Sequence, residues 1–343
     1  YIASFSPDGR QALTGNILWE VATGQVIRRF LASDIDPNNI LASRFSPDGG
    51  MVAITAANNV LLCDTATGEL LRTLSGPSDI MDVVFNPNGQ TLVTATVDTT
   101  LLLWEVQTGA VLRTFSGHDD VVIAAMFSPD GTRFISTSGD NSIILWESAT
   151  GSIVHRFNVS PQVHQSVPIA LAYSPDGNTF VSNSVDGVLA FWDARTFELV
   201  RSITLPGFSF QLAFSHDGRY VLAGEGNTAA LINAATGERV ATLQGHSSNV
   251  GGLSISPDDH YALTTGADDR TVRVWDLYYG AEAAPPVRLP GYGADIAFSR
   301  DEAYMLVSTW SDNTPETPVT LTLYDAASGV EIRRFDADGI AYN

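Results

Sequence analysis

Three groups of residues in the sequence have the types that nucleophilic catalysis uses. Each holds a histidine, a serine or threonine, an aspartate and then a tryptophan: His118, Ser136, Asp140 and Trp146; His164, Ser182, Asp186 and Trp192; His246, Thr265, Asp269 and Trp275. In a catalytic triad the hydroxyl group attacks the substrate, the histidine accepts its proton, and the carboxylate orients the histidine. An oxyanion hole must lie beside these groups.

The same residue types also fit a structural role. Buried polar side chains must be paired, and a fully paired network makes a protein core rigid. Each group would then form a buried hydrogen-bonded chain that ties neighbouring strands together. An enzyme has no need of three active sites at one repeat distance. We therefore predict that the three groups are structural and that none is catalytic.

Other patterns that could carry chemistry are incomplete. The recurrent tryptophans could form a cation-binding box, but their place at the end of a short apolar run favours core packing. Cys63 replaces one of these tryptophans, which predicts a buried and unreactive thiol. The acidic pairs Asp119-Asp120 and Asp258-Asp259 lack the ligand spacing of a calcium loop. No glycine pattern typical of a nucleotide site occurs, so we expect neither a metal nor a cofactor.

The elements that position these residues follow from an internal repeat. A turn resembling Ser-Pro-Asp-Gly recurs after an apolar residue at Phe5, Phe45, Phe85, Phe127, Tyr173, Phe214, Ile255 and Phe298, at intervals of 40 to 46 residues. A bulky residue, usually followed by an acid, recurs in step with it. A Thr-Gly turn often comes next. Short runs rich in Val, Ile, Leu, Phe and Thr lie between the turns and predict strands.

Four strands fit into each repeat, and four-stranded units of this length are typical of β-propeller blades. We predict an all-β chain that forms a single β-propeller of eight four-stranded antiparallel blades. The expected blades are residues 1–30, 31–74, 75–115, 116–157, 158–203, 204–243, 244–289 and 290–343. Seven blades plus one repeat of a neighbouring module is the alternative. The sequence starts and ends like a piece of a longer repeat array.

Within this repeat the sequence resembles the WD-repeat β-propellers. Gly117-His118, Ser136, Asp140 and Trp146-Glu147 give nearly the whole family pattern, and the repeats at His164 and His246 give it again. The resemblance covers essentially the whole chain. The sequence departs from the family pattern in two ways. Five repeats lack the histidine, and the positions at which the pattern has Trp are assigned to Cys63, Asn233 and Tyr324 in three repeats. The resemblance implies a platform for protein interactions, with binding loops on the face that carries irregular connections.

Composition and charge exclude several other classes of protein. The chain has 343 residues, 18 arginines without a lysine, 38 acidic residues and a net charge of −20. Such a surface repels phosphate backbones, so we expect no nucleic-acid partner. A single cysteine permits neither an internal disulfide nor a multi-thiolate zinc site. No apolar run approaches about 18–20 residues, so we expect no membrane insertion.

The acidic residues are concentrated in two kinds of turn that lie at the same end of a blade. They are Asp8, Asp48, Asp130, Asp176, Asp217, Asp258 and Asp301, and Glu20, Asp64, Glu105, Glu147, Asp193, Asp276 and Asp325. Such a face would attract a basic partner. Many arginines instead fall in the predicted outer strands, where charge also protects exposed edges from aggregation.

Loops at the opposite end are the candidate surface for a protein or peptide partner, because loops on a rigid scaffold commonly carry binding. The candidate residues are Asp79, Asp119, Asp120, Gln165, Phe208, Asn249 and Tyr292. We expect a non-catalytic interaction scaffold, within a larger bacterial signalling, defence or assembly protein. The alternatives are an extracellular or cell-surface structural propeller and a hydrolase with a carboxylate site at the propeller channel.

Overall fold

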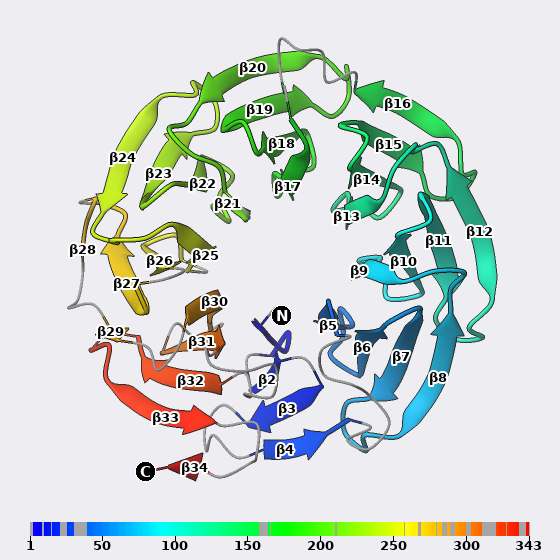
Figure 1. The fold of residues 1–343 in the computed structure, drawn as a ribbon, viewed down its shortest axis with the longest axis horizontal. Helices are drawn as coiled ribbons and strands as arrows, with labels where there is room; N and C mark the ends of the chain where they lie inside the picture. The colour runs from blue at the N-terminus through cyan, green and yellow to red at the C-terminus, as the bar shows by residue number, and fades with distance from the viewer. Residues whose placement is uncertain are drawn as a thin grey trace. The chain divides into compact units, whose positions relative to one another are not determined.

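The computed structural model contains strands and turns, and no helix, in the part of the chain that it describes. The described residues are 3–8, 10–14, 16–20, 26–30, 40–157, 164, 166–209, 211–256, 258–266, 269–278, 280–282, 287–288, 292–299, 303–310, 320–326, 328–335 and 341–342. Eight antiparallel sheets of four or five strands follow one another along the sequence. This is the all-β fold of repeated four-stranded blades that the sequence predicts, a β-propeller (Figure 1).

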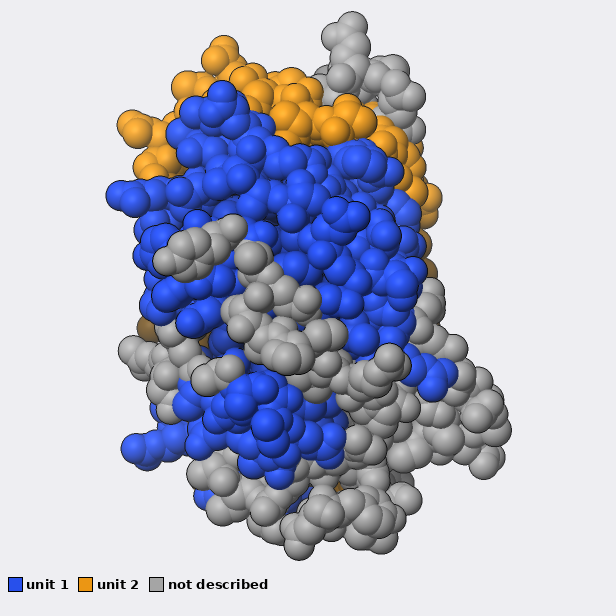
Figure 2. All heavy atoms as spheres, turned by 90° about the vertical axis from the view of Figure 1, so that its left-hand side faces the viewer, with its two compact units in different colours: residues 1–28, 205–343 blue, residues 29–204 orange. Residues whose placement is uncertain are grey.

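The chain divides into two compact units, which are coloured separately in Figure 2. Unit 2 comprises residues 29–204 and holds four consecutive sheets. Its strands are β5 (Ser43–Phe45), β6 (Met51–Ala56), β7 (Asn59–Asp64), β8 (Leu70–Ser75), β9 (Ile80–Phe85), β10 (Thr91–Thr96), β11 (Thr100–Glu105), β12 (Val111–Ser116), β13 (Val122–Phe127), β14 (Arg133–Ser138), β15 (Ile143–Glu147), β16 (Ile153–Phe157), β17 (Pro168–Tyr173), β18 (Thr179–Ser184), β19 (Val188–Asp193) and β20 (Leu199–Thr204).

Unit 1 comprises residues 1–28 and 205–343 and holds the first sheet together with the last three. Its strands are β1 (Ala3–Phe5), β2 (Gln11–Thr14), β3 (Ile17–Glu20), β4 (Val26–Arg29), β21 (Leu212–Phe214), β22 (Tyr220–Glu225), β23 (Thr228–Asn233), β24 (Arg239–Gln244), β25 (Val250–Ile255), β26 (Tyr261–Gly266), β27 (Thr271–Asp276), β28 (Ala281–Glu282), β29 (Val287–Arg288), β30 (Tyr292–Phe298), β31 (Tyr304–Trp310), β32 (Thr320–Asp325), β33 (Glu331–Phe335) and β34 (Ala341–Tyr342).

Within unit 1 the last sheet lies between its neighbours. β30 contacts β25 of the preceding sheet, and it also contacts β1 at the other end of the chain. The eighth repeat is therefore packed against both the seventh and the first.

The Ser-Pro-Asp-Gly turns close the hairpin between the first two strands of each sheet. In the β13–β14 hairpin, Ser128 Oγ donates a hydrogen bond of 2.6 Å to Asp130 Oδ1. The backbone N–H of Gly131 donates to the Ser128 carbonyl over 2.8 Å. Gly131 has a φ of 69°, a conformation that glycine adopts without strain. The turn sequence thus fixes where one strand ends and the next begins.

The core lies between neighbouring sheets rather than inside any one of them. One apolar cluster in unit 2 joins Val93, Leu101 and Phe115 of the β9–β12 sheet to Phe134 and Trp146 of the next sheet. Both faces of the second and third strands are covered, so β14 is buried from Phe134 onward. The fourth strand is largely exposed, and in β12 Phe115 is the buried residue. A repeat of this kind buries its apolar faces only by stacking on its neighbours.

Candidate functional site

The first of the three predicted groups forms one connected hydrogen-bond network in the β13–β16 sheet. His118, in the loop before β13, has its Nε2 atom 2.7 Å from Ser136 Oγ on β14. Trp146 Nε1 on β15 donates to the same hydroxyl oxygen over 2.8 Å. On the other side of the ring, His118 Nδ1 lies 3.1 Å from Asp140 Oδ2 and 2.9 Å from Ser142 Oγ.

The β17–β20 sheet repeats this network, but its second hydroxyl group comes from the end of the second strand. His164 Nε2 lies 2.8 Å from Ser182 Oγ, which also accepts the Trp192 Nε1 hydrogen bond over 2.8 Å. His164 Nδ1 lies 2.6 Å from Ser184 Oγ and 4.0 Å from Asp186 Oδ1. Ser184 Oγ in turn donates to Asp186. The aspartate therefore contacts the histidine chiefly through Ser184.

In the third network the prediction of Thr265 is wrong, and the hydroxyl residue is Thr264. Its Oγ1 atom lies 2.8 Å from His246 Nε2 and accepts the Trp275 Nε1 hydrogen bond over 2.8 Å. Thr265 Oγ1 instead accepts the Gly252 backbone N–H. His246 Nδ1 lies 2.9 Å from Asp269 Oδ2, as predicted for the aspartate.

Strand register explains this error. Thr264 is paired with Arg273, two residues before Trp275, just as Ser136 is paired with Ile144, two residues before Trp146. The β26–β27 hairpin has one more residue between its last paired residues, Thr265 and Val272, than the β14–β15 hairpin has between Thr137 and Ile143. Counting back from the tryptophan therefore gives the wrong position. Since side chains alternate between the faces of a strand, an error of one residue places Thr265 on the opposite face.

Burial and charge set the protonation of these networks. Burial lowers the pKa of all three histidines, and it lowers that of His164 to about 4. Burial acts to raise the pKa of Asp140, but the hydrogen bonds from Ser142 and from the Asp119 backbone bring its pKa below its ordinary value. At neutral pH the imidazole of each network is therefore neutral, and Asp140 and Asp269, whose pKa values are lowered, are ionised.

A neutral histidine between a hydroxyl group and a carboxylate is the arrangement of a catalytic triad. Here, however, a substrate could not reach the hydroxyl group. Ser136, Ser182 and Thr264 have 0% of their surface exposed. Each hydroxyl oxygen also accepts a tryptophan N–H, which reduces its capacity to act as a nucleophile. No group of three or more metal-ligating side chains occurs among the described residues. The geometry ties a loop and two strands together, and we interpret it as structural.

The recurrent tryptophans pack against aromatic residues of the preceding sheet. Trp146 meets Phe115 edge-on, with ring centres 5.5 Å apart, and stacks on Phe134. Trp192 likewise meets Phe157 of the preceding sheet at 5.0 Å. These contacts connect neighbouring sheets and do not form a cation-binding box.

The residues that replace the tryptophan elsewhere are also buried. Cys63 is fully buried, and burial raises the pKa of its thiol to about 11. Tyr324 is buried as well. In the sixth repeat the prediction of Asn233 is wrong, because the register shift that precedes Trp146 in β15 precedes Ile232 in β23. Ile232 fills the core position, and Asn233 takes the place of the following acid and accepts two backbone N–H groups.

The predicted partner-binding loops divide into exposed, half-buried and undescribed positions. Asp79, Asp119 and Asp120 of unit 2 and Asn249 of unit 1 are exposed. Phe208 is half-buried, because the fold covers part of its ring. Gln165 and the Tyr292 side chain lie outside the described residues. The loop before β13 is held by the Asp119 N–H, which donates to Asp140 over 2.8 Å.

An acid within a first strand, Asp82 on β9, was not predicted as a functional residue. Its Oδ1 lies 3.6 Å from Arg44 Nη2 on β5, and its Oδ2 accepts the Ala125 N–H of β13 over 3.3 Å. Burial raises the pKa of this carboxyl group, against the opposing effect of Arg44. Gln211 makes the equivalent contact in unit 1, where its Oε1 accepts the Leu253 N–H over 3.0 Å. Asp82 thus connects three neighbouring sheets, and its signal in the sequence is an acid within an apolar strand.

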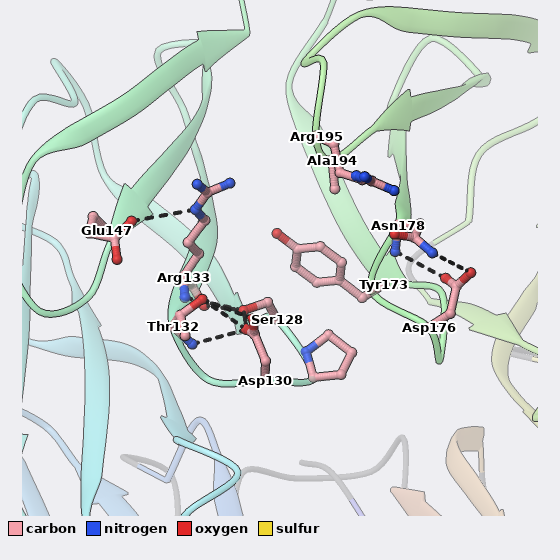
Figure 3. A pocket seen from close by; sticks show the side chains of 12 residues that line it. Ser128, Asp130, Thr132, Arg133, Glu147, Tyr173, Asp176, Asn178, Ala194 and Arg195 are labelled. Carbon is pink, nitrogen blue, oxygen red and sulfur yellow. Dashed lines mark hydrogen bonds and ion pairs between the residues drawn. The ribbon is translucent and has the colours of Figure 1, made fainter.

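At the predicted acidic end of the blades, the carboxylates are ionised and already accept hydrogen bonds from neighbouring residues. A hydrogen bond from the neighbouring serine is the main cause that lowers the pKa of Asp48, Asp130 and Asp176. At the same end, unit 2 has a groove of about 720 Å³ between the β13–β16 and β17–β20 sheets (Figure 3). It is lined by Arg133 and Arg195 as well as by acids, so this end is not uniformly acidic.

Repeated four-stranded blades, joined by buried tryptophans, define a β-propeller of the WD-repeat type. A family model described as "WD domain, G-beta repeat" matches residues 68–105, 109–147, 155–193 and 237–276. These matches identify four repeats of the WD type in the chain, as the resemblance of its sequence indicates. In the described part of the chain, no helix is long and apolar enough to span a membrane.

Relatives with curated descriptions match parts of the chain. An uncharacterized WD repeat-containing protein of Synechocystis sp. is 34% identical over 24% of this chain and 24% of its own length. The periodic tryptophan protein 2 homolog of Neurospora crassa is 30% identical over 33% of this chain and 13% of its own length. Eukaryotic translation initiation factor 3 subunit I of Debaryomyces hansenii is 26% identical over 34% of this chain and 32% of its own length. The matched segments thus span a third or less of each relative.

Proposed function

We propose that this chain is a non-catalytic interaction scaffold that binds a protein or peptide through its loops. The observation that carries the proposal is the state of its polar networks. The hydroxyl groups that could act as nucleophiles are buried and already hydrogen-bonded, whereas the loops beside them are exposed. WD-repeat propellers are generally non-catalytic scaffolds. One matched relative is named as a subunit of a translation initiation factor, which fits a role in an assembly.

The loops before β9 and β13 are the proposed contact surface in unit 2. They expose Asp79, Asp119 and Asp120, and Asp119 and Asp120 stand on a loop fixed by Asp140 and Ser138. Their charge supports a basic partner. A loop that is already ordered loses less conformational entropy on binding. We further propose that the chain is a module of a larger bacterial signalling, defence or assembly protein. Family resemblance alone supports this hypothesis.

Affinity capture from the native source tests the proposal. The bait is the chain itself, compared with a variant that carries Asp79→Asn, Asp119→Asn and Asp120→Asn. We expect a protein that the wild type retains, that the variant loses, and whose retention falls as salt rises. A matched control changes Asp217→Asn in the opposite turns. Equal capture by all three baits would contradict the proposed surface, and substrate turnover by the purified chain would contradict the non-catalytic role.

The size of the native polypeptide tests the finer assignment. We expect its intact mass to exceed 36.7 kDa, the mass of this chain. A native mass equal to that value would contradict a module within a larger protein, but it would leave the scaffold role intact.

A further inference from the structure

When equivalent positions of the repeats are compared, several hold the same residue type in most repeats. A few of these positions in one repeat hold a different residue. At the end of the first strand, Tyr173 stands where six other repeats have Phe. In the turn after the third strand, Arg195 and Phe197 stand where other repeats have Ala and Gly, as in Ala149 and Gly151. At the start of the second strand, where the residue varies from repeat to repeat, this repeat's neighbour has Arg133. The three exceptions and Arg133 lie in or beside one groove of unit 2.

Tyr173 places a hydrogen-bond donor in this groove. Its ring packs against Phe180 with ring centres 5.7 Å apart, and its hydroxyl group points into the space between the two sheets (Figure 3). No described residue forms a hydrogen bond with this hydroxyl group. Burial raises its pKa, so it remains protonated at all physiological pH values. The phenylalanine of the other repeats would pack equally well without this donor.

The two arginines add further donors that the fold leaves unused. Arg133 Nε lies 3.4 Å from Glu147 Oε2, and neither of its terminal nitrogens forms a hydrogen bond to a described residue. The Arg195 side chain is exposed and makes no ion pair with any described acid. Both side chains lie on the groove, one from each sheet (Figure 3). Guanidinium groups bind carboxylates and phosphates through paired N–H groups.

Phe197 supports this arrangement at the expense of backbone strain. Its φ is 65°, in a turn where the equivalent Gly151 has a φ of 78°. A residue that carries a Cβ atom is strained in this conformation, whereas glycine is not. The ring stacks on His155 at 5.1 Å, and the Arg133 guanidinium carbon lies 5.9 Å from its centre. Strain of this kind persists where the surrounding structure holds it, and it is frequent at binding sites.

The acids of the groove are already engaged. Asp130 accepts hydrogen bonds from Ser128 and Thr132, and Asp176 accepts them from Ser174 and Asn178. Glu147 accepts the Arg133 Nε–H. Donors without a hydrogen-bond partner among the described residues remain in the groove: the Tyr173 hydroxyl and the terminal nitrogens of Arg133 and Arg195.

From these donors we infer that the groove between the β13–β16 and β17–β20 sheets binds an anionic group, a carboxylate or a phosphoryl group, carried by a partner polypeptide. Arg133 and Arg195 clasp the group, and Tyr173 donates a hydrogen bond to it. The net charge of −20 repels a free anion at long range. Recognition is therefore short-range and depends on these three side chains. The polypeptide part of this inference rests on the proposed scaffold function, but the anion site does not.

Two small probes test the site directly. Phenyl phosphate and phenylacetate present the two anions on an aromatic ring, and ligand-observed NMR measures their binding to the whole chain. We expect saturable binding with a dissociation constant on the order of 1 mM for at least one probe. Tyr173→Phe and Arg195→Ala restore the residues of other repeats, so the fold is kept. Each should weaken binding about tenfold or more.

The control is Arg72→Ala, which removes an arginine from a second groove of unit 2, between the β5–β8 and β9–β12 sheets. It should leave the binding of both probes unchanged. Tighter binding of phenyl phosphate identifies a phosphoryl group as the natural ligand, and tighter binding of phenylacetate identifies a carboxylate. Binding that does not saturate, or that the two groove variants leave unchanged, would overturn the inference.

The capture experiment distinguishes this inference from the scaffold role. A bait with Tyr173→Phe and Arg195→Ala together should lose a partner that wild type retains. If that bait keeps the partner while the loop variant loses it, the groove takes no part in partner binding and the scaffold role stands. If the probes bind as expected but no bait captures a partner, the anion site is confirmed and the inference that a polypeptide carries the anion is contradicted.

Discussion

Trp146 Nε1 lies 2.8 Å from Ser136 Oγ, and the same oxygen lies 2.7 Å from His118 Nε2. One hydroxyl group thus joins β14, β15 and the loop before β13. The β9–β12 sheet lacks the histidine and keeps half of this arrangement, since Trp104 Nε1 donates to Thr94 Oγ1 over 3.0 Å. The hydroxyl residue is therefore the shared centre of the networks, and the histidine is an addition that fixes the loop.

Removing this centre should destabilise the fold. Ser136→Ala leaves the indole N–H and the imidazole nitrogen buried without a partner, and each such group costs about 1–3 kcal/mol. We expect the free energy of unfolding to fall by about 2–4 kcal/mol, measured by urea denaturation.

Ser136→Thr is the matched control, because Thr94 and Thr264 have the same role in other sheets. It should keep most of the stability. Equal losses for the alanine and threonine variants would show that packing, and not the hydroxyl group, decides the outcome.

Trp146 should contribute more than any hydrogen bond of its network. Its ring is buried and packs on Phe115 and Phe134, so Trp146→Ala leaves a cavity between two sheets. Loss of a buried tryptophan typically costs about 3–5 kcal/mol. Thermal denaturation of this variant should show a large fall in the midpoint temperature. Trp146→Phe, which fills part of the cavity, should fall less, and an unchanged midpoint in the alanine variant would refute the assignment.

The correction from Thr265 to Thr264 can be tested with two nearly isosteric variants. Thr264→Val removes the hydroxyl group that meets both His246 and Trp275, whereas Thr265→Val removes one acceptor of the Gly252 N–H. We expect a loss of about 2–4 kcal/mol for the first variant and about 1 kcal/mol for the second, measured in urea. A larger loss for Thr265→Val would restore the original prediction.

Cys63 should be unreactive in the folded protein. It is fully buried, and burial raises the pKa of its thiol to about 11, so almost no thiolate is present at pH 8. A thiol reagent should modify the native protein slowly and the urea-unfolded protein rapidly, with one thiol reacting per chain. Rapid modification under native conditions would contradict burial of this side chain.

The repeat made the fold predictable. Turn residues such as Pro129-Asp130-Gly131 mark strand ends in sequence, and the apolar runs between them are too short for other elements. The two errors within the repeat, Thr265 and Asn233, share a cause. Each was placed by residue order, whereas the position of a side chain depends on strand register, which one inserted residue or a bulge changes.

The groove and Asp82 were not predictable in the same way. Arg133 and Arg195 belong to different repeats, and their meeting depends on how the two sheets pack, which no spacing within one repeat encodes. Asp82 contacts Arg44 and Ala125, which lie 38 residues before it and 43 residues after it. The sequence does show the positions at which one repeat differs from the others, such as Tyr173 and Arg195. Such exceptions point to function when the structure brings several of them together.

Acid should weaken the fold in a pH range that the buried histidines define. Burial lowers the pKa of His164 from 6.5 to about 4 in the folded chain, and it lowers the pKa of His118 and His246 as well. Between those two values the unfolded chain binds a proton that the folded chain excludes. Stability is therefore fully present above pH 6.5 and declines as the pH falls toward 4. His164 alone should account for about 2 kcal/mol between pH 7 and pH 5.

Other groups act outside this range or in the opposite direction. The pKa values of Asp48, Asp130 and Asp176 lie below 3.8, so their effect begins at lower pH. Asp82, with its raised pKa, favours the folded state as the pH falls and opposes the histidines. Urea denaturation at pH 7, 6 and 5 should show a decreasing midpoint, and His164→Asn should be less stable at pH 7 but less sensitive to pH. If wild type and His164→Asn lose the same stability between pH 7 and pH 5, His164 is not buried as a neutral group, and the network around Ser182 must be reassigned.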